Sequence, residues 1–254
     1  MNFYKEWRML KWKFITILLI MTASAMVVVL TRNIAISALN SPQVQEYLKN
    51  SSKAMSQLLS EISTNFTYYS FTQWFGKSYI QLVAIFAAIM SFSSFSKEFS
   101  KKTIYLLAGR MNRWEIYISK TLTGYMAFAI IVVSGGVAYY ITALLMGYHL
   151  QLQMILSWTF TTTIGGLLLY QIGMYISILF KDQIKSLLLD IAVYVGLYIT
   201  SMLKPTRFLN LFGYMAQNDL LRGKGINIFS TLTVCIICLL IFVGGYFQFK
   251  FKDL

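Results

Sequence analysis

Long uncharged apolar stretches recur along the chain and are separated by shorter segments that carry charge. A helix needs about 20 mostly apolar residues to cross the hydrocarbon layer of a bilayer, and six stretches come close to that length. We expect the six spans at about residues 14–35, 78–96, 121–146, 154–180, 186–203 and 225–249. The pattern therefore predicts an all-α membrane protein with one six-helix transmembrane domain over residues 14–254.

The stretch 121–180 is long enough for two spans and contains one ionisable residue, His149. The polar positions of this stretch cluster at residues 147–153, so the chain is expected to turn there. A lone histidine without partners is poorly suited to catalysis or metal binding. We expect His149 to be a solvated residue at the tip of a helical hairpin.

Residues 1–13 are predicted to form a short interfacial helix before the first span. Phe3, Trp7 and Leu10 recur at helical spacing, and basic residues occupy other positions of the helical wheel. Amphipathic helices of this kind lie at the membrane surface, with tryptophans at the headgroup level. A cleaved signal peptide is the alternative for the first apolar run, but the run continues through Leu30, which favours an uncleaved anchor.

Basic residues are distributed unequally between the two sides of the expected topology. If both termini are inside, 14 of the 22 Lys and Arg residues fall in 47 internal positions, and the other 8 are spread over 74 external positions. Basic residues concentrate in the cytoplasmic loops of membrane proteins. We therefore expect cytoplasmic N and C termini in a multi-pass protein of a bacterial inner (cell) membrane.

Two external segments are predicted to be more than loops. Residues 41–62 carry an amphipathic helical pattern, and residues 204–224 are too short and polar to span but too apolar for water, which indicates a re-entrant or interface-lying segment. The aromatic and Met-rich groups near these segments either line the outer end of a substrate pathway or form an interfacial belt. The candidate gate residues are Trp74, Phe75, Phe208, Phe212 and Met215.

Several chemistries are disfavoured by the residues present. The net charge of +13 is not gathered into one patch, so no nucleic-acid partner is expected. Cys235 and Cys238 lie inside an apolar stretch, where they act as small hydrophobic residues, and no metal or catalytic constellation is predicted. Asp190 is the one acid within the expected spans, and it serves either an ion pair with Lys181 or Lys185 or a conformational role.

The loop between the second and third spans contains the most informative motif. Residues 97–120 resemble the intracellular signature of the ABC-2 family of transporter permeases: an acid closes the second span, a Leu-Leu pair and a small-residue turn follow, and a Lys opens the third span. Lys102 replaces the family glycine, and residues 109–112 replace its Ser-Pro turn. The residues carried over from the resemblance are Glu98, Thr103, Leu106, Leu107, Arg110, Arg113, Ile116 and Lys120.

The resemblance implies a coupling helix in this loop that docks on a cytoplasmic ABC ATPase dimer. The apolar edge formed by Ile104 and Leu107 is expected to face the ATPase, and charge reversal at Glu98 or Arg113 is expected to uncouple ATP hydrolysis without unfolding the membrane domain. No phosphate-binding loop occurs in the chain. The chain itself is therefore expected to be no enzyme and to bind no cofactor, with ATP-Mg held by the partner.

Six spans make half of a transport pathway in this family, so a second permease copy or a paralogous permease is also implied. The expected cargo is an amphipathic peptide, such as a toxin or bacteriocin, or another hydrophobic compound. A non-ABC membrane protein, such as a secondary transporter or a membrane scaffold, remains the alternative.

Overall fold

The computed structural model describes residues 3–39, 41, 61–202, 210–223 and 225–252, and the described part of the chain is helical without β-strands. Among the described residues, six helices are long and apolar enough to cross a membrane. The predicted six-helix membrane architecture is therefore confirmed. The amphipathic pattern at residues 41–62 falls almost entirely outside the described residues, as does Phe208.

The helices follow one another in the order expected for six consecutive spans. The second span is built from several consecutive helical pieces, and a short helix, α8, follows it. The elements are α1 (Phe3–Leu30), α2 (Arg32–Leu39), α5 (Phe66–Ser70), η1 (Phe71–Ser78), α6 (Tyr79–Ser91), α7 (Ser96–Ser100), α8 (Thr103–Ala108), α9 (Arg113–Leu145), α10 (Leu152–Leu179), α11 (Gln183–Met202), α12 (Leu211–Ala216), η3 (Asn218–Arg222) and α13 (Ile228–Phe251).

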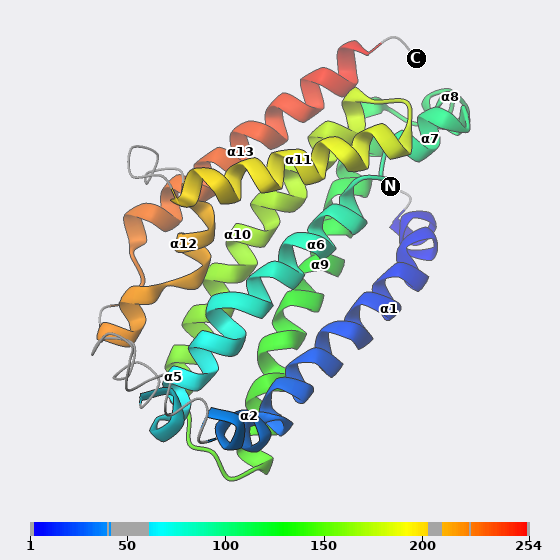
Figure 1. The fold of residues 1–254 in the computed structure, drawn as a ribbon. Coiled ribbons are helices and arrows are strands. Elements are labelled where there is room, and N and C mark those ends of the chain that lie inside the picture. Colours follow the sequence, from blue (N-terminus) through cyan, green and yellow to red (C-terminus); the bar gives the residue numbers. More distant parts are fainter. Residues whose placement is uncertain (1–2, 40, 42–60, 203–209, 224, 253–254) are drawn as a thin grey trace.

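The long helices lie side by side as a tilted bundle (Figure 1). α10 packs against α6, α9, α11, α12 and α13, and α1 packs along α9. Both chain ends lie at the same end of the bundle, beside α7 and α8, and we call this the termini end. The opposite end, which carries α2, α5 and the α9–α10 connection, is called the far end.

The first span differs from its prediction. α1 runs from Phe3 to Leu30 without a break, so the described residues 3–13 continue directly into the first span. The charged first turns are compatible with a continuous helix because Glu6 is buried against a basic partner, whereas Arg8 and Lys11 are solvent-exposed and Lys5 and Lys13 are partly exposed. The predicted start of the first span was placed after the last charged residue, Lys13, whereas the helix continues through the charged residues.

The second span is also longer than predicted, because helical structure begins at Phe66. The aromatic run that was expected to precede the span is part of it. Residues Phe71–Ser78 form a π-helix in which the Tyr79 amide donates to the Trp74 carbonyl, five residues back. π-Helical turns are rare and often occur at functional sites.

The segment before the last span is half-buried, as its composition indicated. Within its described part, α12 packs on α10 and α11, and Leu211, Tyr214 and Met215 are buried. At the α9–α10 connection, Gly147 adopts a positive φ and His149 is exposed. The predicted hairpin tip is thus confirmed.

Close helix packing depends on small residues on α10. At Gly173, an added Cβ would lie 2.0 Å from Ser91 Oγ and 2.8 Å from Ser91 Cβ. Separations this short are not tolerated, so α6 and α10 would have to move apart. Small residues at helix contacts of membrane proteins permit such approach of backbones.

Gly173→Ala is expected to destabilise the protein, whereas Gly244→Ala is the matched control. Gly244 is also helical, but an added Cβ there meets nothing within 4 Å, so alanine gains up to about 1 kcal/mol of helix propensity without a clash. Thermal unfolding in detergent should show a lower midpoint for the first variant and an equal or higher midpoint for the second. Equal midpoints for both variants would contradict the tight packing at Gly173.

Candidate functional site

The candidate site lies at the termini end, where the second span turns into α7 and α8. The backbone between α6 and α7 is held by one buried side chain, because Ser177 Oγ accepts from the amides of Phe95 and Ser96, each at 3.0 Å, and donates to the Phe92 carbonyl. Polar backbone groups freed at a helix break need such partners inside a membrane protein. α7 is thereby fixed to α10.

A buried ion network joins three helices at this turn. Lys120 Nζ on α9 lies 2.9 Å from Glu6 Oε2 on α1 and 2.9 Å from Glu98 Oε1 on α7. Lys5 Nζ lies 3.5 Å from Glu98 Oε1 at the rim. Lys120 is 4% exposed, Glu98 5% and Glu6 7%. Two acids and two bases balance in charge, which is the condition under which buried charges are tolerated.

A second set of polar contacts fastens the end of the last span. Arg113, the first residue of α9, donates from Nη1 to the backbone carbonyls of Phe249, Lys250 and Lys252. These carbonyls lie at the C-terminal end of α13, where the last turn of a helix leaves acceptors without intrahelical partners. A cation at this position also interacts favourably with the helix dipole.

Lys252 extends this connection to α10. Its ammonium donates to the carbonyls of Ile178 and Leu179 and lies 4.2 Å from the centre of the Phe99 ring. Burial, together with the Lys181 charge, lowers the pKa of Lys252. Helices α7, α9, α10 and α13 are therefore linked at the termini end by groups that contact one another.

α8 presents a surface different from the predicted one. Ile104 is fully buried and Leu107 is partly buried, so the apolar edge expected to face a partner packs against the protein itself. The exposed groups are Leu106 (73% exposed) and Tyr105 (42% exposed). They are accompanied by the exposed residues Lys101, Lys102, Thr103 and Arg110.

The predicted coupling residues thus separate into two groups. Glu98, Arg113 and Lys120 form inward contacts that hold the helices together, whereas Thr103, Leu106 and Arg110 face outward. The expectation that charge reversal at Glu98 leaves the fold intact conflicts with this geometry, because reversal would place three basic groups together around a buried position. The contribution of Glu6 and Lys5 to this site was not predicted. The available sequence signal was that Glu6 is an acidic residue among the basic residues of the first helical turns.

Lys102 has an unusual backbone conformation. Its φ is 56° and its ψ is 12°, in the left-handed region, directly before the first residue of α8. L-residues with a side chain pay about 1–2 kcal/mol for this conformation, and glycine does not. The turn between α7 and α8 therefore requires a backbone geometry that glycine adopts more easily.

Three of the candidate gate residues lie in the interior of the bundle, and Phe208 falls outside the described residues. Trp74, Phe75 and Met215 are fully buried, and Phe212 is partly buried. The Phe75 ring stacks 4.9 Å from Trp158 and meets Tyr139 edge-on, and Trp74 stacks on Tyr139. The helical extension from Phe66 carries Trp74 and Phe75 into the bundle, where their side chains form part of the core, and Met215 joins this core from α12.

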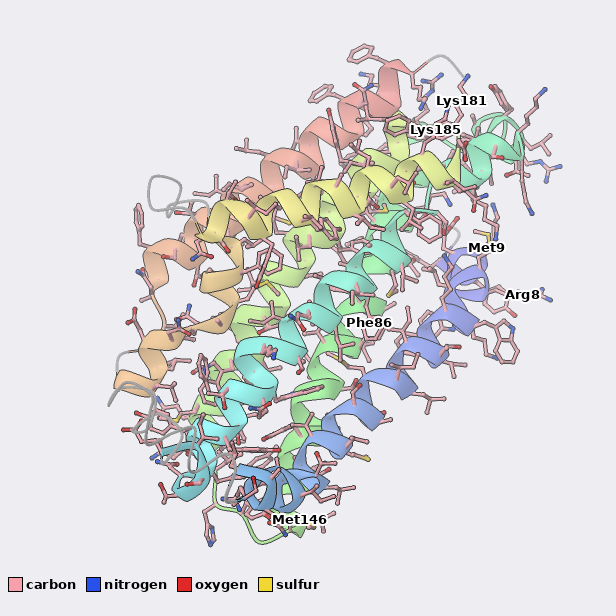
Figure 2. All side chains as sticks on the ribbon, in the orientation of Figure 1. Arg8, Met9, Phe86, Met146, Lys181 and Lys185 are labelled. Carbon is pink, nitrogen blue, oxygen red and sulfur yellow. The ribbon has the colours of Figure 1, made fainter. Side chains whose placement is uncertain are left out.

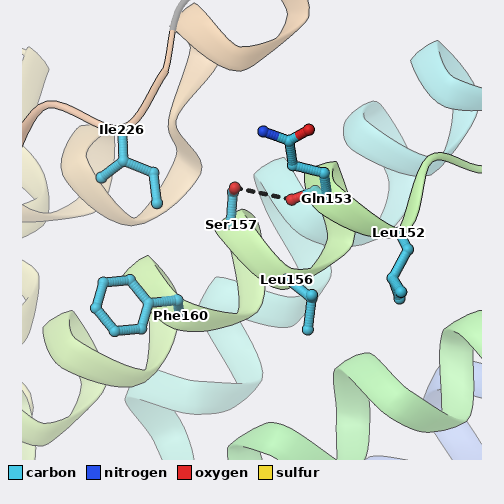
Figure 3. A pocket seen from close by; sticks show the side chains of 6 residues that line it. All are labelled: Leu152, Gln153, Leu156, Ser157, Phe160 and Ile226. Atoms are coloured by element: carbon cyan, nitrogen blue, oxygen red, sulfur yellow. Dashed lines mark hydrogen bonds between the residues drawn. The ribbon is translucent and has the colours of Figure 1, made fainter.

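A shallow apolar groove of about 510 Å³ lies on α10 near the far end (Figure 3). Ser157 Oγ in this groove donates to the Gln153 carbonyl, so this hydroxyl is already paired. The groove is open, and its surface is almost wholly apolar. Its lining residues are Leu152, Gln153, Leu156, Ser157, Phe160 and Ile226.

Comparison with known proteins identifies no relative. A scan of protein-family models, a search of curated proteins and a search of solved structures each found no match.

Lys120→Met is expected to lower stability by about 3–5 kcal/mol, since it leaves Glu6 buried without its basic partner. The control is Lys5→Met, which removes the basic group at the rim, whose side chain is 35% exposed, and should cost no more than about 1 kcal/mol. Unfolding midpoints in detergent measure both effects. If the double variant Lys120→Met, Glu6→Gln recovers none of the loss, the stabilisation does not arise from the buried pair.

Lys102→Gly is expected to stabilise the protein by about 0.5–1 kcal/mol, the difference between the left-handed penalty and the entropy cost of glycine. Lys101→Gly is the matched control, because Lys101 has a φ of −84° and gains nothing from glycine. The unfolding midpoint should rise for the first variant and stay level or fall for the second. The opposite order would show that the turn does not hold Lys102 in a strained conformation.

Proposed function

We propose that this chain is the transmembrane permease subunit of an ATP-driven ABC exporter in a bacterial cell membrane. The observation that carries the proposal is α8: a short helix at the termini end that exposes Leu106 and Tyr105 among basic residues. Its opposite edge is anchored by the buried Ile104. A small exposed helix with a rigid base is suited to docking in a groove of a cytoplasmic protein.

The connection between α8 and the spans supports a coupling role. α8 follows α7 directly, and α7 carries Glu98, whose carboxylate contacts Lys120 on the third span; Lys120 also contacts Glu6 on the first span. A displacement of α8 would thus act on two spans through groups in direct contact. Such contiguous, packed contacts are the physical basis on which coupling between distant sites depends.

The strained turn supports the resemblance to the ABC-2 permeases. Lys102 occupies the position at which the resembled signature has glycine, and its backbone lies in the left-handed region that glycine favours. The backbone geometry of the signature is thus compatible with this chain although the residue differs. Under the proposal, ATP hydrolysis belongs to a separate ABC ATPase dimer, and this chain contributes no catalytic group.

The proposal includes a second permease copy or a paralogous permease, because six spans supply half of a pathway. The proposed cargo is an amphipathic peptide or another hydrophobic compound that exchanges with the lipid. The absence of charge from residues 121–180, apart from His149, supports this cargo class, because a hydrophilic ion would lack compensating groups along α9 and α10. A secondary transporter or a membrane scaffold is the alternative, and neither would use an ATPase at α8.

The docking surface is tested with a photo-crosslinking amino acid placed at position 106 of the chain in native membranes. Position 145 is the control, because Leu145 is similarly exposed (81%, against 73% for Leu106) but ends α9 at the far end of the bundle. We expect a protein with a phosphate-binding loop to crosslink at position 106 and not at position 145. If position 106 yields no crosslink, or yields only proteins without ATPase motifs, the proposed function is wrong.

Substitutions on the exposed surface of α8, with position 145 again as the control, test coupling in the purified complex with that ATPase. Leu106→Glu with Arg110→Glu should remove cargo-stimulated ATP hydrolysis, because both changes alter the exposed surface of α8. The free energy of unfolding should change by no more than about 0.5 kcal/mol, as expected for surface substitutions. Leu145→Glu should leave the stimulation intact.

A further inference from the structure

A polar cluster lies inside the packing of α6, α10 and α11, apart from the ion network described above. Asp190 and Ser186 are one turn apart on α11, and both are fully buried. Ser91, at the end of α6, is also fully buried and directs its hydroxyl toward the Asp190 carboxylate. Ser91 and Asp190 thus come within 3.5 Å of each other from two helices, and Ser186 is buried one turn from Asp190 within the membrane-spanning bundle.

The Asp190 carboxylate has no cationic partner among the described residues. No described Lys, Arg or His nitrogen lies within 4 Å of it, and the expected ion pair with Lys181 or Lys185 is not formed. Both lysines are exposed at the start of α11, at the termini end (Figure 2). An acid in this position is costly unless something compensates its charge.

The polar atoms of the cluster are also incompletely hydrogen-bonded. Asp190 Oδ1 and Ser186 Oγ are buried without a hydrogen-bond partner in the described part of the chain. Ser91 Oγ lies 3.3 Å from the Ala88 carbonyl oxygen and 3.5 Å from Asp190 Oδ2, both longer than the usual 2.5–3.0 Å, roughly, of an O–H···O hydrogen bond. Buried polar atoms of a folded protein are nearly always paired, so this cluster lacks a partner.

The spacing of the oxygens is also compatible with a shared ion. When two oxygens bind the same hard cation, each at about 2.4 Å, and the oxygen–cation–oxygen angle is about 90°, the two oxygens lie about 3.4 Å apart. The 3.5 Å separation of Ser91 Oγ and Asp190 Oδ2 is close to this value. Carboxylate and hydroxyl oxygens are ligands for hard cations, and one carboxylate balances a single positive charge.

Gly173 on α10 lets these oxygens lie close against the backbone of that helix. An added Cβ at this position would lie 2.0 Å from Ser91 Oγ and 3.1 Å from Asp190 Oδ2, so any side chain would displace the Ser91 hydroxyl and crowd the carboxylate. The helices are held in register on both sides of the cluster. Tyr194 Oη donates to the Leu169 carbonyl at 2.6 Å, and Ser177 fastens α10 to the end of α6.

We propose that Asp190, Ser91 and Ser186 form a binding site for one sodium ion between α6, α10 and α11. The ion compensates the Asp190 charge and bridges α11 to α6. Ser186 lies in the first turn of α11, so entry from the termini end along the start of α11 is the shortest route. The site does not rest on the proposed export function, and it applies equally to a transporter of another class.

The test uses the purified full-length chain in detergent. Thermal unfolding in sodium chloride is compared with unfolding in choline chloride at equal ionic strength, and equilibrium binding of radioactive sodium is measured in parallel. We expect sodium to raise the unfolding midpoint and to bind with one ion per chain, because a ligand that binds only the folded state stabilises it. Ser186→Ala should weaken sodium binding by at least about tenfold.

Asp190→Asn should abolish both sodium effects, and Asp219→Asn, which changes an exposed acid on η3, should leave them unchanged. If Asp190→Asn does not fold, Ser186→Ala alone decides the outcome, because it removes a ligand and leaves the charge. The proposal is overturned if sodium and choline give the same midpoint, if sodium stabilises the Asp190 and Ser186 variants as it does the wild type, or if only a lower pH stabilises the protein, since a proton would then be the sole ligand.

Discussion

The Lys120 ammonium, shared between the carboxylates of Glu6 and Glu98, is the contact on which the termini end of the bundle depends. It joins α1, α7 and α9 at one point, and each partner is buried. Because both carboxylates contact this ammonium, its loss would leave Glu6 buried without a basic partner and Glu98 with only the rim contact to Lys5. The positions of α7 and of the exposed α8 follow from this contact and from the Ser177 contacts to the backbone between α6 and α7.

Around this point, the remaining polar groups of the termini end are arranged to satisfy helix ends. Arg113 and Lys252 donate to carbonyls that the last turns of α13 and α10 leave free. Glu98, Arg113 and Lys120 therefore serve the packing of the bundle, whereas α8 and the turns on either side of it expose charged residues. The same division explains why a motif read as one functional unit contains both structural and exposed residues.

Much of the fold could be predicted from hydropathy and charge. The number of spans, the hairpin tip at His149 and the half-buried segment before the last span follow from apolar length and polar clusters. Helix boundaries could not be predicted in this way, because a hydropathy window that stops at charged residues places a boundary at Lys13 or Lys120. α1 and α9 continue through these positions, since Lys120 is paired with Glu6 inside the bundle. Partners far apart in sequence leave no local signal, and the orientation of Trp74, Phe75 and Ile104 depended on such partners.

The π-helix at Phe71–Ser78 has a consequence for how the second span can change in evolution. Its wider turn, closed by the bond from the Tyr79 amide to the Trp74 carbonyl, accommodates more residues in this stretch than an α-helix of equal length would. An α-helix turns by about 100° per residue and the wider π-turn by less, so conversion of this stretch to α-helical bonding at unchanged length would rotate everything on one side relative to the other. The aromatic core at the far end and the small-residue contact at Ser91 therefore keep their relative phase only while this stretch stays π-helical.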